Sequence, residues 1–226
     1  MNRTMPRAFP LIAALTLFAA WMPMTATAGY NAQLCGALEN AYGPFDYTDP
    51  IHKRQKLPVV ERHHFNRDVA QARRGVGTKN TPGQDIDYTL RAFPNHHAAL
   101  YAVMLYTMQV PLGRHPKGLQ FAPDCYYQRA LAWRPNDPTV HMVYGVFLSK
   151  TGKLERALEE YETAIELSPE YAEAHYNYGL LLLDNGRHEK ALEHAQRAYE
   201  LGFPLDGLKR KLLQAGVWRD AADAGS

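Results

Sequence analysis

The sequence predicts an all-α protein built as a short α-solenoid. Three observations support this fold class: residues recur at a spacing of 34 in the second half, prolines recur at a similar spacing, and apolar residues follow helical periodicity. Stacked helix pairs produce such a period, because each pair buries its apolar face only against the next pair. We expect about two regular helix pairs, one degenerate pair, a C-terminal capping helix and an irregular N-terminal extension.

Residues 1–28 have the composition of a secretory signal peptide. Arg3 and Arg7 are their only charged side chains, an apolar stretch follows, and Ala26 and Ala28 supply the small residues that signal peptidase requires. The apolar stretch is shorter than the ~20 residues needed to span a bilayer. We therefore expect cleavage after Ala28, a periplasmic location and no membrane span in the mature chain. A retained membrane anchor is the alternative.

Cleavage would also change the charge balance. The chain has 25 Lys and Arg residues against 23 Asp and Glu, and loss of Arg3 and Arg7 makes the two classes equal. A neutral mature chain has no general electrostatic attraction to nucleic acid or anionic lipid. We therefore expect no nucleic-acid partner.

Residues 29–93 are expected to form the N-terminal extension, because they contain no repeat. Residues 66–75 fit a short helix with a cap at each end. Residues 53–58 and 75–83 are expected to be loops.

The chain has two cysteines, Cys35 in the extension and Cys125 further along. An even number of cysteines in an exported chain is compatible with one disulfide. Two separate buried thiols are the alternative. No C-x-x-C redox motif is present, and two cysteines alone do not make a zinc site.

The strongest signal is an internal repeat. Five pairs of small or apolar residues are each 34 positions apart: Gly145 and Gly179, Gly152 and Gly186, Ala157 and Ala191, Ala164 and Ala198, and Leu167 and Leu201. This period, with small residues where two helices cross, resembles the tetratricopeptide repeat (TPR), whose unit is two antiparallel helices. The second unit departs from the pattern, because Ala195 stands where Tyr161 predicts an aromatic residue.

Residues 94–203 are expected to form the repeats. Pro135 precedes Pro169 by 34 residues and follows Pro94 by 41, so an earlier unit with an enlarged internal loop precedes the two regular ones. Its first helix is expected over residues 96–110. Residues 204–226 are expected to form a capping helix and tail, with an apolar side made of Leu205, Leu208, Leu212 and Leu213 and a polar side made of Lys209, Arg210 and Lys211.

In tetratricopeptide repeats the first helix of each unit lines a concave groove. The resemblance therefore implies partner contacts at Thr139, Met142, Val146, Ser149 and Lys150 from one unit, and at Glu173, Tyr176, Asn177, Leu180, Leu183 and Asp184 from the next. Some members of the family hold a C-terminal carboxylate here, but only Asn177 matches their pattern. An apolar groove suits an amphipathic helix or an extended apolar peptide. Filling of the groove by the chain's own N-terminal extension stays open as the alternative.

No catalytic motif, metal-ligand spacing or cofactor motif is found, so we expect a non-enzymatic protein without metal or cofactor. Six histidines precede the regular repeats and invite a metal-site hypothesis: His52, His63, His64, His96, His97 and His115. Ordinary polar or partly buried roles explain them more simply. Glu61, with His63 and His64, is the nearest acid–base candidate.

The sequence thus predicts a periplasmic TPR scaffold or adaptor that binds a protein partner in cell-envelope assembly, secretion or maintenance. One alternative is a metal-binding, ligand-binding or hydrolytic protein with a site in residues 52–97. Another is a membrane-tethered structural subunit whose signal is not cleaved. Fold alone does not choose a partner or a pathway.

Overall fold

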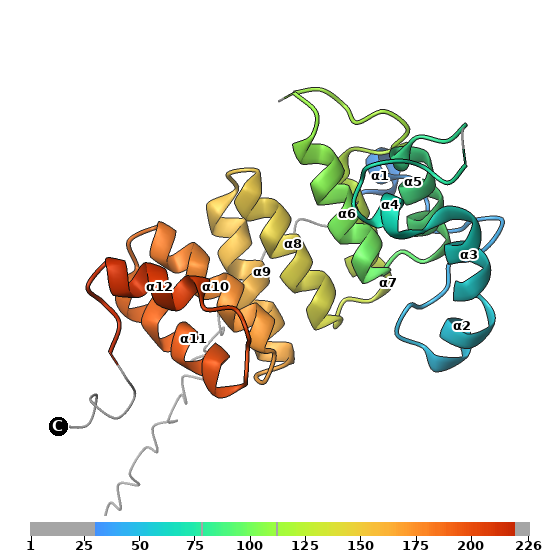
Figure 1. Cartoon of the computed structure of the whole chain (residues 1–226). Coiled ribbons are helices and arrows are strands. Elements are labelled where there is room, and N and C mark those ends of the chain that lie inside the picture. The colour runs from blue at the N-terminus through green and yellow to red at the C-terminus, as the bar shows by residue number, and fades with distance from the viewer. Residues whose placement is uncertain (1–29, 78, 112, 220–226) are drawn as a thin grey trace, which may run out of the picture.

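The computed structural model describes residues 30–77, 79–111 and 113–219, and within them the chain forms twelve helices and no strand. Neighbouring helices pack in pairs that follow one another along the molecule (Figure 1). The prediction of an all-α, TPR-like α-solenoid is therefore confirmed. The predicted signal peptide, residues 1–28, lies outside the described residues. No helix among the described residues is long and apolar enough to cross a bilayer.

Two regular helix pairs form the second half of the molecule. In each pair the first helix packs along the second, and the second helix of one pair contacts the first helix of the next. The first regular repeat consists of α8 (Pro138–Lys150) and α9 (Leu154–Leu167), and the second consists of α10 (Ala172–Asp184) and α11 (His188–Glu200).

Local sequence explains where these helices begin and turn. Asp137 caps α8, because its carboxylate accepts hydrogen bonds from the backbone N–H groups of Thr139 and Val140 at 3.1 and 3.3 Å. Gly152 and Gly186, just after α8 and α10, have φ angles of 75° and 72°. Glycine adopts this left-handed conformation without a Cβ clash, so the chain reverses tightly into the second helix of each pair.

The interior of the pairs is apolar. Leu148 and Leu182 have no exposed surface, and Tyr161 is only 2% exposed. Full burial of a side chain of this size contributes about 1.5–3 kcal/mol. The 34-residue period therefore places buried residues at equivalent points of both repeats.

The helix α12 (Gly207–Gln214) covers the end of the second repeat and packs against α10 and α11. Leu208 and Leu212 are fully buried, whereas Leu205 and Leu213 are 58% and 54% exposed. The four-leucine apolar side expected from the sequence was therefore wrong in two positions. Leu205 precedes the helix, and Leu213 follows Leu212 by about 100° around the helix axis, which turns it away from α10.

An irregular helix pair precedes the regular ones. The helix α6 (His97–Met108) packs against α8 and against α7 (Pro123–Trp133), and the connection between α6 and α7 is long and non-helical where it is described. The helix α5 (Pro82–Ala92) packs against α6. Thr81 starts α5 with a reciprocal capping interaction with Gln84.

Besides α5, the described part of the predicted N-terminal extension contains four short helices: α1 (Ala32–Cys35), α2 (Pro50–Gln55), α3 (Leu57–His64) and α4 (Arg67–Ala70). The loop expected over residues 53–58 was wrong, because this segment belongs to α2 and α3. Pro58 does not break α3, since it occupies the first turn, where its missing N–H has no helical partner to lose. The helix expected over residues 66–75 is shorter, and Asn66 caps it.

The extension is held on α7 by two different contacts. Cys35 and Cys125 form a disulfide with their Cα atoms 5.1 Å apart. Arg129, which is 1% exposed, donates hydrogen bonds from Nη1 to the carbonyl oxygens of Cys35, Gly36 and Ala37 at 2.9, 3.0 and 2.7 Å. A disulfide that closes a loop between residues 90 positions apart contributes about 4.6 kcal/mol in the chain-entropy description. The helix α1 is therefore tied to α7.

Candidate functional site

A hollow of about 490 Å³ lies between the first helices of the regular repeats and the capping helix. The helices α8, α10 and α12 form its sides, and Tyr161 reaches it from α9. Seven of the residues predicted from the groove register line it: Val146, Ser149, Lys150, Tyr176, Asn177, Leu180 and Asp184. The structure thus brings together side chains from two repeats that the chain separates by 34 positions.

The hollow has an apolar floor and a polar rim. Tyr161, Tyr176 and Leu181 are 2%, 9% and 8% exposed and form the floor. The ring of Tyr176 also packs on Phe203, with the ring centroids 4.4 Å apart. Because these rings are held by their neighbours, the floor is a rigid apolar surface that a partner side chain could cover.

Four predicted groove residues do not line the hollow. Met142 is 4% exposed, and its sulfur accepts a contact of 3.7 Å from Asn177 Nδ2. Met142 is therefore buried behind the lining of the hollow, in contact with Asn177. Thr139 and Leu183 are half-buried, and Glu173 is exposed near the start of α10.

The capping helix supplies four lining residues that the sequence analysis did not include: Gly207, Arg210, Lys211 and Gln214. A signal for all four is present in the sequence, because each follows a predicted groove residue by 34 positions: Gly207 follows Glu173, Arg210 follows Tyr176, Lys211 follows Asn177, and Gln214 follows Leu180. Extending the repeat register one unit beyond residue 203 would have found them.

The rim is mainly cationic. Lys150, Arg210 and Lys211 line the hollow, and Asp184 is the one carboxylate among the described lining residues. Lys211 Nζ lies 2.8 Å from Asp184 Oδ1, and Arg210 pairs with Asp206 at 3.3 Å. All four of these paired side chains are about half exposed or more, so each pair is weak and can exchange partners.

None of the described residues that line the hollow belongs to the N-terminal extension. Its helix α1 packs on α7, α3 on α5, and α4 on α5 and α6. Figure 1 shows α1, α2, α3 and α4 at the opposite end of the molecule from α12. Among the described residues, the groove lining comes only from α8, α9, α10 and α12.

The histidines of the first half contact separate partners. His64 Nδ1 lies 3.0 Å from Asp85, His96 Nε2 lies 3.3 Å from Glu61, and His97 Nε2 lies 2.9 Å from Asp137.

The other three histidines also lie apart. His52 accepts a hydrogen bond from the Asp46 N–H, His115 donates one to the Leu119 carbonyl, and His63 is exposed. Within the described residues, no group of three or more His, Cys, Asp or Glu side chains is arranged to hold a metal ion. Glu61, His63 and His64 do not form an acid–base set, because Glu61 and His64 contact different residues.

The surroundings shift the pKa of two side chains in this region, His96 and Asp137. Burial lowers the pKa of His96, although the Glu61 carboxylate opposes that shift. The pKa of Asp137 falls despite its burial, because His97, Asn95 and the α8 backbone stabilise the carboxylate. These interactions explain the polar residues of this region as structural contacts.

A second repeat feature was missed in the sequence. His141 and His175 are 34 positions apart, both are at least 90% buried, and each has Nε2 against the carbonyl oxygen of the proline six residues earlier, at 2.8 and 3.1 Å. Because a carbonyl only accepts, Nε2 must carry a proton in both rings. Each Nδ1 then faces the second helix of its own repeat.

The residues facing Nδ1 differ between the two repeats. His141 Nδ1 lies 2.6 Å from Glu160, whereas His175 Nδ1 lies 2.9 Å from His194 Nδ1. Burial opposes protonation of His141, but the hydrogen bonds with Glu160 and Pro135 outweigh it and raise the pKa. Burial and the neighbouring His175 lower the pKa of His194 to about 4.

Comparison with known families supports the fold assignment. A tetratricopeptide repeat family model matches residues 148–202, which run from the end of α8 to just past α11. The match covers less than half of the chain and supports membership of the TPR superfamily. The search of curated proteins found no match. A tetratricopeptide repeat suggests a protein–protein interaction scaffold, and folds of this kind are typically non-catalytic.

Proposed function

We propose that this protein is a scaffold that binds a peptide segment of a protein partner in the hollow between α8, α10 and α12. The observation that carries this proposal is the lining itself, where consecutive first helices present half-buried apolar side chains beside polar ones. A rigid floor with a polar rim can bury partner side chains and orient their backbone. The proposed role is non-catalytic and requires no metal or cofactor.

We further propose that the protein acts in the periplasm, in assembly, secretion or maintenance of the cell envelope. The signal-like residues 1–28 support export. The disulfide between Cys35 and Cys125 adds independent support, because such bonds persist in oxidising compartments. Mass spectrometry of the native protein should find a chain that begins at Gly29, whereas retention of residues 1–28 would favour the membrane-tethered alternative.

Site-specific photo-crosslinking tests the binding role. A photoreactive residue placed at Val146 or Leu180, inside the hollow, should yield a discrete adduct with a protein partner in intact cells. The same residue at the exposed Lys190 on α11 is the matched control. Absence of adducts at both groove positions, or equal adducts at all three, would contradict binding in the groove.

A further inference from the structure

The helix α6 carries an exposed apolar stripe outside the hollow described above. Tyr101 and Met108 are 42% and 46% exposed, and Leu105 between them is half-buried. Their spacing of four and three residues places all three on one face of the helix. Clustered exposed apolar residues of this kind mark interaction sites on soluble domains.

Repeat register places this stripe in line with the hollow. The 41-residue spacing between Pro94 and Pro135 also separates Tyr101 from Met142, Leu105 from Val146, and Met108 from Ser149. A further step of 34 reaches Tyr176, Leu180 and Leu183.

The packing order of the helices agrees with this register. The helix α6 packs against α8, α8 against α10, and α10 against α12. Figure 1 shows these four helices following one another along the molecule. The α6 stripe therefore extends the face of α8 and α10 that leads to the hollow.

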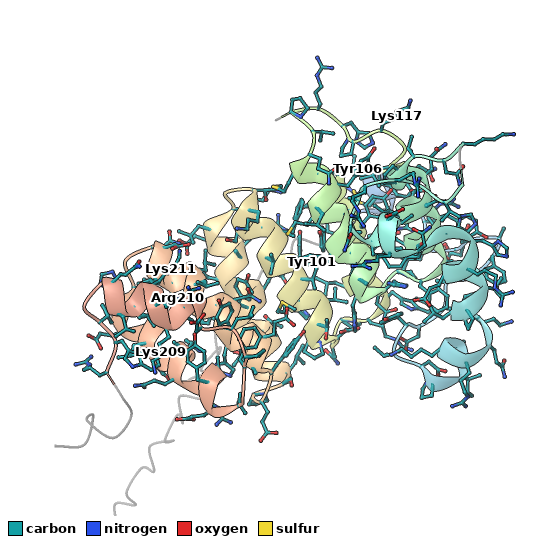
Figure 2. All side chains as sticks on the ribbon, viewed as in Figure 1. Tyr101, Tyr106, Lys117, Lys209, Arg210 and Lys211 are labelled. Carbon is teal, nitrogen blue, oxygen red and sulfur yellow. A yellow bond between two sulfur atoms is a disulfide. The ribbon has the colours of Figure 1, made fainter. Side chains whose placement is uncertain are left out.

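The chemistry of this face changes along its length. Its α6 positions hold only uncharged side chains, whereas Arg210 and Gln214 occupy the equivalent positions on α12. Figure 2 labels Tyr101 near the middle of the molecule and Arg210 with Lys211 towards the end that carries α12.

Three cations and one carboxylate line the hollow at the α12 end. Lys150 forms no ion pair within the described residues, and Arg210 is paired only with an exposed carboxylate one helical turn away. Besides Asp184, the groove residues predicted from the sequence include one acidic residue, Glu173. It lies at the start of α10, away from Lys150 at the end of α8. The face thus has an apolar end and a cationic end.

We propose that this face binds an acidic amphipathic segment of a protein partner, with its apolar side chains on α6 and α8 and its carboxylates at Lys150, Arg210 and Lys211. This inference rests on the proposed function and names the class of segment that the groove accepts. Charge complementarity selects the segment, because partner carboxylates can replace the weak solvent-exposed pairs of Arg210 and Lys211. The apolar end sets the direction in which the segment lies.

Selection from a random peptide library displayed on phage tests this inference on the disulfide-bonded protein without residues 1–28. We expect the enriched peptides to combine apolar residues with several Asp or Glu residues. Replacing those acidic residues by Asn or Gln should weaken binding of a selected peptide about tenfold, measured by fluorescence anisotropy, because several exposed ion pairs are lost together. Raising the salt concentration should reduce the difference.

Charge reversal on the protein tests the same contacts from the other side. The double variant Lys150→Glu, Arg210→Glu should weaken the acidic peptide at least about tenfold, and Lys190→Glu on α11 should leave its affinity unchanged. Tyr101→Ser should weaken both the acidic peptide and its neutral version. All of these positions are exposed, so thermal melts should show unchanged folding.

The possible outcomes separate the two proposals. Enrichment of neutral or basic peptides that compete for the groove would overturn the acidic segment while leaving the scaffold function intact. Failure to enrich any peptide would overturn both. An acidic peptide whose affinity does not respond to Lys150 and Arg210 would also overturn the inference, because it would bind elsewhere.

Discussion

The two regular repeats have the same helices at the same register, but they fill their interiors differently. In the first repeat, the ring of Tyr161 occupies the space beside Gly145, and a Cβ at that glycine would lie 3.1 Å from the ring. In the second repeat, Ala195 stands at the equivalent position. Leu208 of α12 fills the space instead, and its Cδ2 would lie 2.7 Å from a Cβ at Gly179.

This difference shows how a solenoid can end. The first repeat closes its helix pair with its own aromatic side chain. The second repeat lacks that side chain and takes a leucine from the next helix along the chain. The capping helix α12 is therefore part of the core of the second repeat and also supplies cations to the hollow.

The largest expected effect comes from removing the two space-filling side chains. Tyr161→Ala should lower the free energy of unfolding by about 3–5 kcal/mol, and Leu208→Ala by about 2–5 kcal/mol. Chemical denaturation measures both losses. Hydrogen exchange should then show that Leu208→Ala loosens α10 and α11, against which α12 packs, more than α8. Equal loosening of both repeats would contradict a special dependence of the second repeat on α12.

A medium effect is expected at the glycines. Gly145→Leu and Gly179→Leu should each destabilise the fold by about 1–3 kcal/mol, because a larger side chain forces the paired helices apart. Gly179→Ala should be tolerated better than Gly145→Ala, since the end of the Leu208 side chain can rotate away, whereas the buried Tyr161 ring cannot. Thermal melts of the four variants would rank them, and a more damaging Gly179→Ala would reverse this interpretation.

The smallest effect concerns pH, and it has opposite signs in the two repeats. The pKa of His141 is raised, so its stabilising contribution is complete below about pH 6.5 and is lost as the pH rises through the folded-state pKa. The pKa of His194 is lowered to about 4, so stability is lost as the pH falls from about 6.5 towards that value.

The variant His194→Glu tests this contrast, because it rebuilds in the second repeat the His–Glu pair of the first. When the pH falls from about 7 to about 5, we expect the free energy of unfolding of this variant to rise by about 1–2 kcal/mol relative to that of the wild type. In the wild type, the first proton that binds to the His175–His194 pair leaves their hydrogen bond in place, so its cost is mainly the desolvation of a buried charge. Denaturant titrations at both pH values measure the gain. An unchanged difference between the two proteins would contradict it.

The fold was predictable to a large extent, because its signals are local. Gly152 and Gly186 identify the turns, and the small residues at Gly145 and Gly179 identify the helix crossings. Boundaries were less predictable in the extension, where Pro58 lies in the first turn of α3 and was interpreted as a loop residue. The same proline is compatible with a loop and with a helix start, so sequence alone could not decide.

The candidate site was predictable in part. The resemblance to tetratricopeptide repeats, applied in register, predicted seven of the eight residues of α8 and α10 that line the hollow, and it missed Leu181. It did not nominate Arg210 or Lys211, because these residues were assigned to the polar side of a capping helix. Arg129 gave no sequence signal, since its partners are the carbonyl groups of α1 and the two residues after it, more than ninety positions away.

The sequence by itself thus determined the helix pairs and their period, because glycine conformation and apolar spacing act over a few residues. The face that lines the groove was implied by the resemblance to tetratricopeptide repeats. Only the tertiary structure decided how α12 completes the second repeat, which carbonyl groups Arg129 holds, and how His175 meets His194. Those contacts depend on which distant helices lie side by side. Side chains of several types could satisfy the same local pattern, and packing chooses among them.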